Sequence, residues 1–212
     1  MKNIEQINLS VQVGCGLRAR SQWLNFDKSP SLLLSKVPGL NRIIQLPAWS
    51  PLARYGDIVS GLPIRDGSCA RIYADQVFEH LTREGFRHAL RNAYRYLAPG
   101  GVLRFFIPHL RQMADEYVAN SDPQASHLLM LRLGMGVDQN YRGIEGFLRK
   151  LIGNSRHLWL WDEATLREEL LQVGYQEIQS VVYGDSGDAM FDMIELPVPW
   201  DFSLGTQALK PA

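Results

Sequence analysis

The sequence predicts an α/β fold in which a mainly parallel sheet is covered by helices on both faces. Apolar and polar residues alternate strictly from Ile7 to Val13, which is the period of a strand with one buried face. Apolar residues recur at spacings of three and four between Leu81 and Leu97, as they do in an amphipathic helix. Short apolar strands then alternate with such helices along the chain, and this order is typical of parallel sheets.

The composition of the chain indicates which kinds of binding partner and which cellular location to expect. The 212 residues suffice for one domain with its own core. Lys plus Arg equals Asp plus Glu, at 22 each, so no net field attracts nucleic acid, and we expect no nucleic-acid partner. The chain has no apolar leader at its start and no run near the ~18 apolar residues of a membrane span. The two cysteines, Cys15 and Cys69, are expected to stay reduced, which favours a cytoplasmic location.

The first half of the chain divides into strands and one irregular stretch. After the opening strand, a short apolar segment at 23–26 leads into Asp27. Four prolines interrupt the next segment, so we expect an irregular or short-helical excursion there. The predicted elements are, in order, strands at 7–13 and 23–26, the excursion at 28–56, and short strands at 57–59 and 70–74.

The second half begins with the helix at 81–97, for which Thr82 is the expected N-cap. Pro99-Gly100-Gly101 is expected to stop that helix and turn the chain. A further helix should begin after Asp162 and end at Gly174. The other predicted elements are a buried strand at 102–107, a mostly helical segment at 109–156, strands at 178–183 and 190–196, and a loose tail after Pro199.

Gly14-Cys15-Gly16 directly follows the first predicted strand. Glycines there let the backbone approach a ligand, and free N–H groups can bind an anion or a carboxylate. A tight turn without a ligand explains the same pattern. Together with Ala19, the two glycines also satisfy the dinucleotide pattern G-x-G-x-x-A.

Asp27 ends the second predicted strand, where an acidic side chain can accept hydrogen bonds from both hydroxyls of a ribose. In dinucleotide-binding domains this acid lies about 20 residues beyond the glycines, whereas Asp27 follows Gly16 by 11. So short a link cannot hold a full crossover helix, so one face of the first strand should lack its usual cover. A plain turn residue is the alternative role for this aspartate.

Several further motifs together resemble a known family. They are Asn25-Phe26-Asp27-Lys28-Ser29-Pro30, Gly61-Leu62-Pro63-Ile64-Arg65-Asp66-Gly67-Ser68, Glu79-His80-Leu81, Leu97-Ala98-Pro99-Gly100-Gly101, Arg156-His157-Leu158-Trp159-Leu160-Trp161-Asp162 and Gly184-Asp185-Ser186. Their order and spacing resemble the class I S-adenosylmethionine-dependent methyltransferases of the type 11 group, and more closely a bacterial subgroup of them. The resemblance covers roughly residues 7–196.

The resemblance implies a Rossmann-like, seven-stranded sheet whose last two strands are antiparallel, with S-adenosylmethionine bound at the carboxyl ends of the strands. It implies one methyltransferase domain over 1–212, with a helical insertion at 109–156 after the fifth strand that covers the substrate. No metal ion is expected. The implied cofactor contacts are Gly14, Cys15 and Gly16 to the methionine part, Asp27 to the ribose, Asp57 and Leu62 near the adenine, and Gln76 beside the cofactor.

An alcohol acceptor would also need a general base, and three histidines are candidates. His109 follows the fifth predicted strand at the edge where ligands bind in such sheets, and it is the preferred catalytic residue. His80 is expected to serve in packing or capping. His157 is expected to anchor packing together with Trp159 and Trp161. The remaining candidates for acceptor contacts are Tyr141, Arg142 and Arg149.

Three functions fit these residues. The first is a methyltransferase acting on a small-molecule or carbohydrate-like acceptor. The second is a nicotinamide-dependent oxidoreductase, suggested by the glycine pattern and opposed by the short reach to Asp27. The third is a non-catalytic module with the methyltransferase fold, suggested by Ala70, where the family usually has Asp, and by the lack of an obvious base. The sequence does not indicate an oligomeric state.

Overall fold

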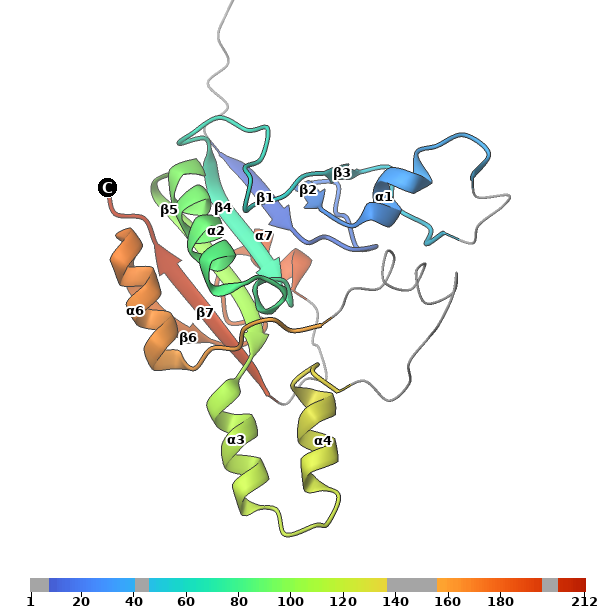
Figure 1. The fold of residues 1–212 in the computed structure, drawn as a ribbon. Helices are drawn as coiled ribbons and strands as arrows, with labels where there is room; N and C mark the ends of the chain where they lie inside the picture. The colour runs from blue at the N-terminus through green and yellow to red at the C-terminus, as the bar shows by residue number, and fades with distance from the viewer. Residues whose placement is uncertain (1–7, 41–45, 137–155, 196–201) are drawn as a thin grey trace, which may run out of the picture.

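The computed structural model describes residues 8–40, 46–136, 156–195 and 202–212. Seven strands form one sheet in the order β3-β2-β1-β4-β5-β7-β6, and helices lie on both of its faces (Figure 1). The strands are β1 (Leu9–Val13), β2 (Leu24–Asp27), β3 (Ala53–Tyr55), β4 (Cys69–Asp75), β5 (Leu97–Pro108), β6 (Gln176–Val181) and β7 (Ser203–Leu209).

The direction of the strands confirms the predicted Rossmann-like sheet. β1 to β5 pair in parallel throughout, and β7 runs antiparallel to both β5 and β6. Because parallel strands end at the same edge, the loops that follow β1, β2, β3, β4 and β5 gather at one side of the sheet. That side positions the candidate site.

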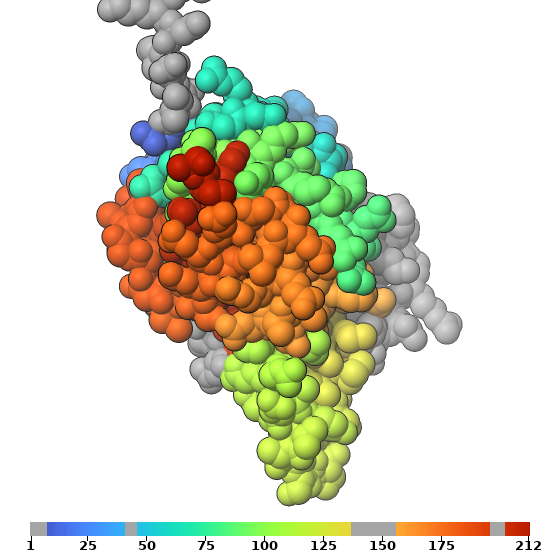
Figure 2. All heavy atoms as spheres, turned by 90° about the vertical axis from the view of Figure 1, so that its left-hand side faces the viewer, coloured from blue at the N-terminus to red at the C-terminus, as the bar shows by residue number. Residues whose placement is uncertain are grey.

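Helices α2 (Arg83–Tyr96) and α6 (Glu163–Val173) cover one face of the sheet. Figure 2 views the molecule from the α6 side, where that helix forms the outer layer. Arg87 donates to the Glu169 carboxylate from two nitrogens, each at 2.7 Å, and so ties the two helices together. The predicted caps are present, because Thr82 accepts from the Gly85 N–H and Asp162 from the Thr165 N–H.

The other face has a thinner cover. In the described chain no helix separates β1 from β2, as the 11-residue link predicted. The rings of Tyr73 and Phe106 on this face pack instead against Trp23, from the link itself, and against Phe191 of α7 (Ala189–Ile194). A residue of the short link and a late helix therefore take the place of the missing crossover helix.

Two predictions for the end of the chain were wrong. Within the predicted strand at 190–196, residues 190–194 belong to the helix α7, because Asp188 caps it and the buried Phe191 and Ile194 lie three residues apart on one side. The tail after Pro199 is not loose, because β7 fills the position between β5 and β6. A Cβ on Gly205 would lie 2.2 Å from the Val181 carbonyl oxygen, so this strand needs a glycine to fit.

Two predictions in the middle of the chain also needed correction. The predicted strand at 57–59 is only an isolated bridge between Asp57 and Gly61, and the strand β3 lies four residues earlier. Only Ala53 of β3 is buried, so the strand carries no apolar alternation. Pro99-Gly100-Gly101 lies inside the first part of β5, which begins at Leu97, and the helix already ends at Tyr96. Gly100 has a φ of 77°, and the pairing of β5 with β4 shifts at this point.

After β5, α3 (Leu110–Ala119) and α4 (Ala125–Arg132) project from the body as a helical hairpin (Figures 1 and 2). This agrees with the predicted helical segment, although 137–155 lies outside the described residues. A cleft of about 450 Å³ between the two helices is lined by Met113, Tyr117 and Leu128, among others. Earlier in the chain, α1 (Pro30–Ser35) accounts for part of the 28–56 excursion. No described helix has the length and apolar character needed to cross a membrane.

Replacing Asp162 with alanine should lower the free energy of unfolding by about 1 kcal/mol, the usual value of such a cap. Hydrogen bonds from the Thr165 backbone N–H and hydroxyl lower the pKa of this carboxyl below its usual value. Because the folded-state pKa is depressed, the contribution is present above the unfolded pKa of about 3.9 and is lost as the pH falls through the folded pKa. Urea denaturation at pH 7 and at pH 3 measures both effects; an equal cost at the two pH values would contradict this role.

Candidate functional site

The candidate site lies where the parallel strands end. Val13, the last residue of β1, is paired with Phe26 on one side and with Ala74 on the other. The next residues along the chain, Gly14, Asp27 and Asp75, therefore lie at one edge of the sheet. This is the edge at which ligands bind in open α/β sheets.

The glycine loop has the conformation that only glycine adopts easily. Gly14 has a φ of 66° and Gly16 a φ of 51°, both in the left-handed region. A Cβ on Gly14 would lie 2.3 Å from a methyl carbon of Val77, so the loops that follow β1 and β4 pack directly on each other. A Cβ on Gly16 would meet nothing within 4 Å. The space above Gly16 is therefore open.

Asp27 lies against this loop, as predicted. Its side chain is nearly buried, with 7% of the residue exposed. One carboxylate oxygen accepts from the Gly16 N–H at 2.9 Å and the other accepts from the Ser29 N–H at 2.8 Å. The hydrogen bond from Ser29 stabilises a turn, so Asp27 both serves as a turn residue and lies beside the glycine loop. A carboxylate can accept about four hydrogen bonds, and each oxygen therefore keeps acceptor capacity beside the open space.

Asn25 braces the link between β1 and β2, a role that the sequence analysis missed. Its side-chain oxygen accepts from the Arg20 N–H at 3.0 Å, and its nitrogen donates to the carbonyls of Arg20 and Trp23 at 2.9 and 2.6 Å. The residue is 1% exposed. These hydrogen bonds hold the link in place where a crossover helix is absent. The position of Asn25 in the N-x-D motif was the sequence signal that could have indicated this role.

Cys15 faces away from the open space. Its side chain packs with Leu32 and Ala53. Burial, reinforced by the nearby Asp27 charge, raises the pKa of its thiol to about 12, so the thiol stays protonated. Cys15 and Cys69 are both free. Any contact of Cys15 with a ligand would therefore come from its backbone.

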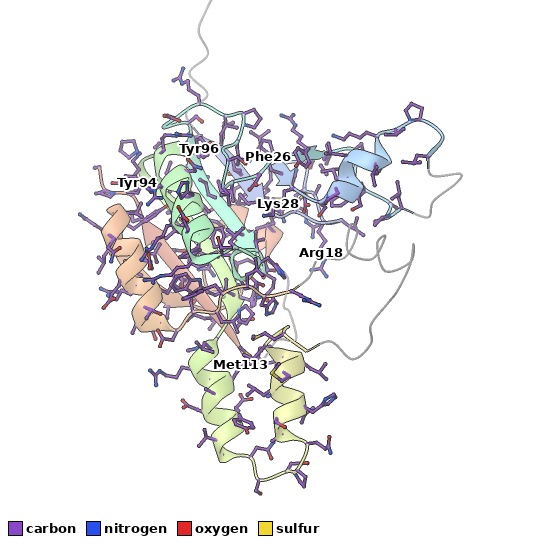
Figure 3. The ribbon with its side chains drawn as sticks, viewed as in Figure 1. Arg18, Phe26, Lys28, Tyr94, Tyr96 and Met113 are labelled. Atoms are coloured by element: carbon purple, nitrogen blue, oxygen red, sulfur yellow. The ribbon has the colours of Figure 1, made fainter. Side chains whose placement is uncertain are left out.

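Asp57 lies two residues beyond the end of β3 and so close to this edge, whereas Leu62 lies farther along the chain, next to the last residue of α2. The Asp57 carboxylate accepts from the Val59 N–H at 2.9 Å. The Leu62 N–H donates to the Tyr96 hydroxyl at 2.7 Å. A Cβ on Gly56 would lie 2.9 Å from Leu62 and 2.7 Å from Phe26, so Leu62 is close to the end of β2. Figure 3 labels Phe26 on β2 and Tyr96 at the C-terminal end of α2.

The residues after β4 complete the edge. Gln76 has a φ of 52°, and its N–H donates to the Phe106 carbonyl at 2.9 Å. The Asp75 carboxylate accepts from the Tyr183 hydroxyl at 2.9 Å. Burial raises the pKa of Asp75, and both this hydrogen bond and the charge of Arg18 oppose that shift. Arg18 projects from the loop after β1 (Figure 3), and neither it nor Asp75 was among the predicted site residues.

The candidate bases occupy two places. His109 follows β5 at the same edge and is the N-cap residue of α3. Its backbone N–H donates to the Phe202 carbonyl at 2.8 Å. His80 and His157 lie together, with ring centroids 5.0 Å apart. Both are next to Glu79, which is fully buried at 0% exposure. Burial, and secondarily the charge of Asp75, raises the pKa of Glu79 to about 8. Tyr141, Arg142 and Arg149 lie outside the described residues.

Comparisons with known proteins agree with this geometry. The sequence model of the methyltransferase domain family, type 11, matches residues 11–105, which span β1 to most of β5. No curated protein matches the sequence. The family match covers the segment that carries Gly14, Asp27 and Gln76, and it confirms the predicted resemblance to class I methyltransferases.

Solved structures resemble the whole chain at low identity. A protein from Bordetella parapertussis, described as a possible exported protein, has 15% identity and a TM-score of 0.52 over 99% of this chain and 65% of its own. A candidate S-adenosylmethionine-dependent methyltransferase from Listeria monocytogenes has 17% identity and a TM-score of 0.51 over 98% of this chain and 93% of its own. The CurJ carbon methyltransferase has 14% identity and a TM-score of 0.50, over all of this chain and 50% of its own. The chain thus spans less than two thirds of two of these proteins, and such identities establish the fold alone.

Proposed function

We propose that this chain, which contains a match to the methyltransferase domain family at residues 11–105, is an S-adenosylmethionine-dependent methyltransferase. Methyltransferases of this class take their methyl group from S-adenosylmethionine, which is therefore the cofactor of the proposed reaction. The observation that carries the proposal is the Asp27 carboxylate, held 2.9 Å from the Gly16 N–H beside an open space.

The residues at this edge fit that cofactor. Asp27 would accept hydrogen bonds from the two ribose hydroxyls, because both of its oxygens retain acceptor capacity. The backbone of Gly14, Cys15 and Gly16 would lie along the methionine part. Asp57 and Leu62 would border the adenine, and Gln76 would border the cofactor after β4.

The protein's share of the chemistry would be mainly positioning. When bound, the cofactor supplies a methyl group that its positively charged sulfonium already activates. The glycine loop and the residues after β4 would orient the donor, and helices near the edge would exclude water while an acceptor is held in line. For an alcohol acceptor, His109 would take the proton, because it lies at the carboxyl end of β5 and is partly exposed.

We further propose a small-molecule or carbohydrate-like acceptor. The balanced charge of the chain, 22 basic and 22 acidic residues, gives no field that would concentrate a polyanionic nucleic acid. The hairpin of α3 and α4 follows His109 directly, and as the first part of the predicted cover over 109–156 it would restrict access to the site. A single methyltransferase domain over 1–212 and a cytoplasmic location stay predictions.

The oxidoreductase alternative has little support from the structure. A nicotinamide dinucleotide places its pyrophosphate at the N-terminus of the helix that follows the first strand. In the residues described, β1 is followed by a turn and then by β2, with no helix between them. The non-catalytic alternative keeps the cofactor site and lacks only turnover.

Titration calorimetry with S-adenosylmethionine, S-adenosylhomocysteine and NADH separates these functions. The proposal expects micromolar binding of the first two ligands and none of NADH. Incubation with methyl-labelled cofactor and fractionated small-molecule or saccharide extracts should then give a labelled product. Binding of NADH alone would overturn the proposal, whereas cofactor binding without any labelled product would favour the non-catalytic module.

A further inference from the structure

Glu79, His80 and His157 form a cluster that the proposed reaction does not use. Glu79 and His80 belong to the short 3-10 helix η2 (Phe78–His80) after β4, and His157 comes from the segment that leads to α6. One ligand atom from each residue can be chosen so that all three lie within 4.8 Å of one another. Two segments 77 to 78 positions apart in the chain thus bring three metal-binding side chains together.

The Glu79 carboxylate is an unusual group to bury. It is 0% exposed, and neither of its oxygens has a hydrogen-bond partner among the described residues. Its nearest basic atoms are the Nε2 atoms of His80 at 3.9 Å and of His157 at 4.0 Å. Leaving a buried carboxyl without a hydrogen bond is costly, and paired or metal-bound groups are the usual exceptions. The Glu79 side chain therefore lies in the cluster with no hydrogen-bond partner from the part of the chain that the structure describes.

His80 is oriented as metal-bound histidines usually are. The Nδ1 atom of His80 lies 3.0 Å from the Arg156 carbonyl oxygen, which can only accept a hydrogen bond. His80 therefore donates from Nδ1, and in the neutral ring the lone pair is left on Nε2, the atom 3.9 Å from Glu79. This contact to a backbone carbonyl is the orienting partner found behind most metal-bound histidines.

We propose that Glu79, His80 and His157 form a binding site for a divalent transition-metal ion of the zinc class. Two imidazoles and one carboxylate are a common ligand set for Zn²⁺, with one position left for water or another oxygen. Around one zinc ion such ligand atoms lie roughly 3.4 Å apart. The two carboxylate-to-imidazole separations are 3.9 and 4.0 Å, and all three atoms lie within 4.8 Å of one another, so the three side chains would have to move closer together on binding. Partial exposure of both histidine side chains, 28% and 15%, provides a route of entry.

The proposal departs from the sequence-based expectation of no metal ion. It does not depend on methyl transfer, because the site can bind zinc whether or not the chain turns over. It also gives the two segments a reason to be tied together. The Glu79 carbonyl already accepts from the Leu158 and Trp159 N–H groups at 2.7 and 3.2 Å, and a bound ion would add a second link at the same residue.

The test is a zinc titration of the chelator-treated, full-length protein in competition with a chromophoric chelator. We expect one equivalent of Zn²⁺ to bind with a submicromolar Kd, and one equivalent of Co²⁺ to give visible absorption bands of a low-coordinate site. Glu79→Gln and His157→Ala should each weaken zinc binding by at least about 100-fold, since loss of an orienting partner alone costs 10- to 100-fold. His88→Ala, at an exposed surface histidine beside Glu84, is the matched control and should bind zinc normally.

A second readout covers the case in which a variant fails to fold. Histidine ring signals of the wild-type protein, followed by NMR during zinc addition, should shift for His80 and His157 and stay in place for His88. No zinc binding tighter than about 0.1 mM, or zinc shifts at His88 without shifts at the other two, would overturn the proposal. So would unchanged affinity in a folded His157→Ala protein.

Discussion

We expect Asp27→Ala to weaken the binding of S-adenosylmethionine by at least about 100-fold. In the proposed site this carboxylate accepts hydrogen bonds from both ribose hydroxyls. A hydrogen bond to a charged acceptor contributes about 1.5–3 kcal/mol to the free energy of binding. Loss of two such bonds gives about 3 kcal/mol or more, which corresponds to about two orders of magnitude in Kd. Titration calorimetry of the wild-type and variant proteins measures the change.

Asp27 also has a structural role, so the prediction needs controls. The carboxylate satisfies the N–H groups of Gly16 and Ser29, and the variant should therefore unfold more easily as well. The affinity is to be measured at a temperature where circular dichroism shows the variant fully folded. Asp66→Ala is the matched control, because Asp66 is exposed and pairs with Arg95 on the helix α2, and it should bind the cofactor normally. A folded Asp27→Ala protein with wild-type affinity would refute the assigned role.

The geometry of the carboxyl edge was predictable because its signals are local. The local backbone conformation requires glycine where φ is positive, and the position of Asp27 is set by the end of its own strand. Gly14, Gly16 and Asp27 could therefore be identified from the sequence. The short link between them also predicted a missing helix. The residue that makes so short a link stable, Asn25, was visible only as part of a motif, because its three hydrogen bonds depend on how the chain returns.

The end of the chain was not predictable in the same way. β7 has the sequence Ser-Leu-Gly-Thr-Gln-Ala-Leu, which is too polar and too rich in small residues to suggest a central strand. It is an interior strand because β5 and β6 hydrogen-bond to it from both sides, and β5, unlike β6, lies far from it in the sequence. The cluster of Glu79, His80 and His157 has the same origin, since it needs a contact between segments 77 to 78 positions apart.

Arg104 is the clearest case of a residue whose partners could not be predicted from the sequence around it. It interrupts the apolar strand Val102 to Ile107 and is 0% exposed, yet nothing near it in the sequence neutralises it. In the structure it donates to both oxygens of Glu195, to Asp185 at 2.7 Å and to the Val182 carbonyl at 2.8 Å. The Gly184 N–H also donates to Glu195 at 2.8 Å. The Gly184-Asp185-Ser186 motif is therefore part of a buried ionic network. This network holds the segment that contains α7 against β5.

We expect Arg104→Met to lower the free energy of unfolding by about 3–5 kcal/mol. Removal of one partner of a buried ion pair leaves the other charge buried and unpaired, and that is the usual cost. The stranded group would be Glu195, which is 6% exposed, whereas Asp185 can turn to solvent. Guanidinium denaturation followed by tryptophan fluorescence measures the loss. Arg71→Met is the matched control, because the Arg71–Asp188 pair is about 30% exposed on both sides and should cost less than about 1 kcal/mol.

The double variant Arg104→Met/Glu195→Leu distinguishes a stranded charge from a simple loss of packing. If the cost of the single change comes from the unpaired Glu195 carboxylate, removing that carboxylate should restore about 2 kcal/mol or more, since apolar replacements of buried ion pairs are often neutral. If Arg104 matters only through its contacts with the rings of Phe106 and Phe191, the two changes should add. A double-mutant cycle that gives additive losses would therefore refute the ionic account and would leave packing as the reason for an arginine inside this sheet.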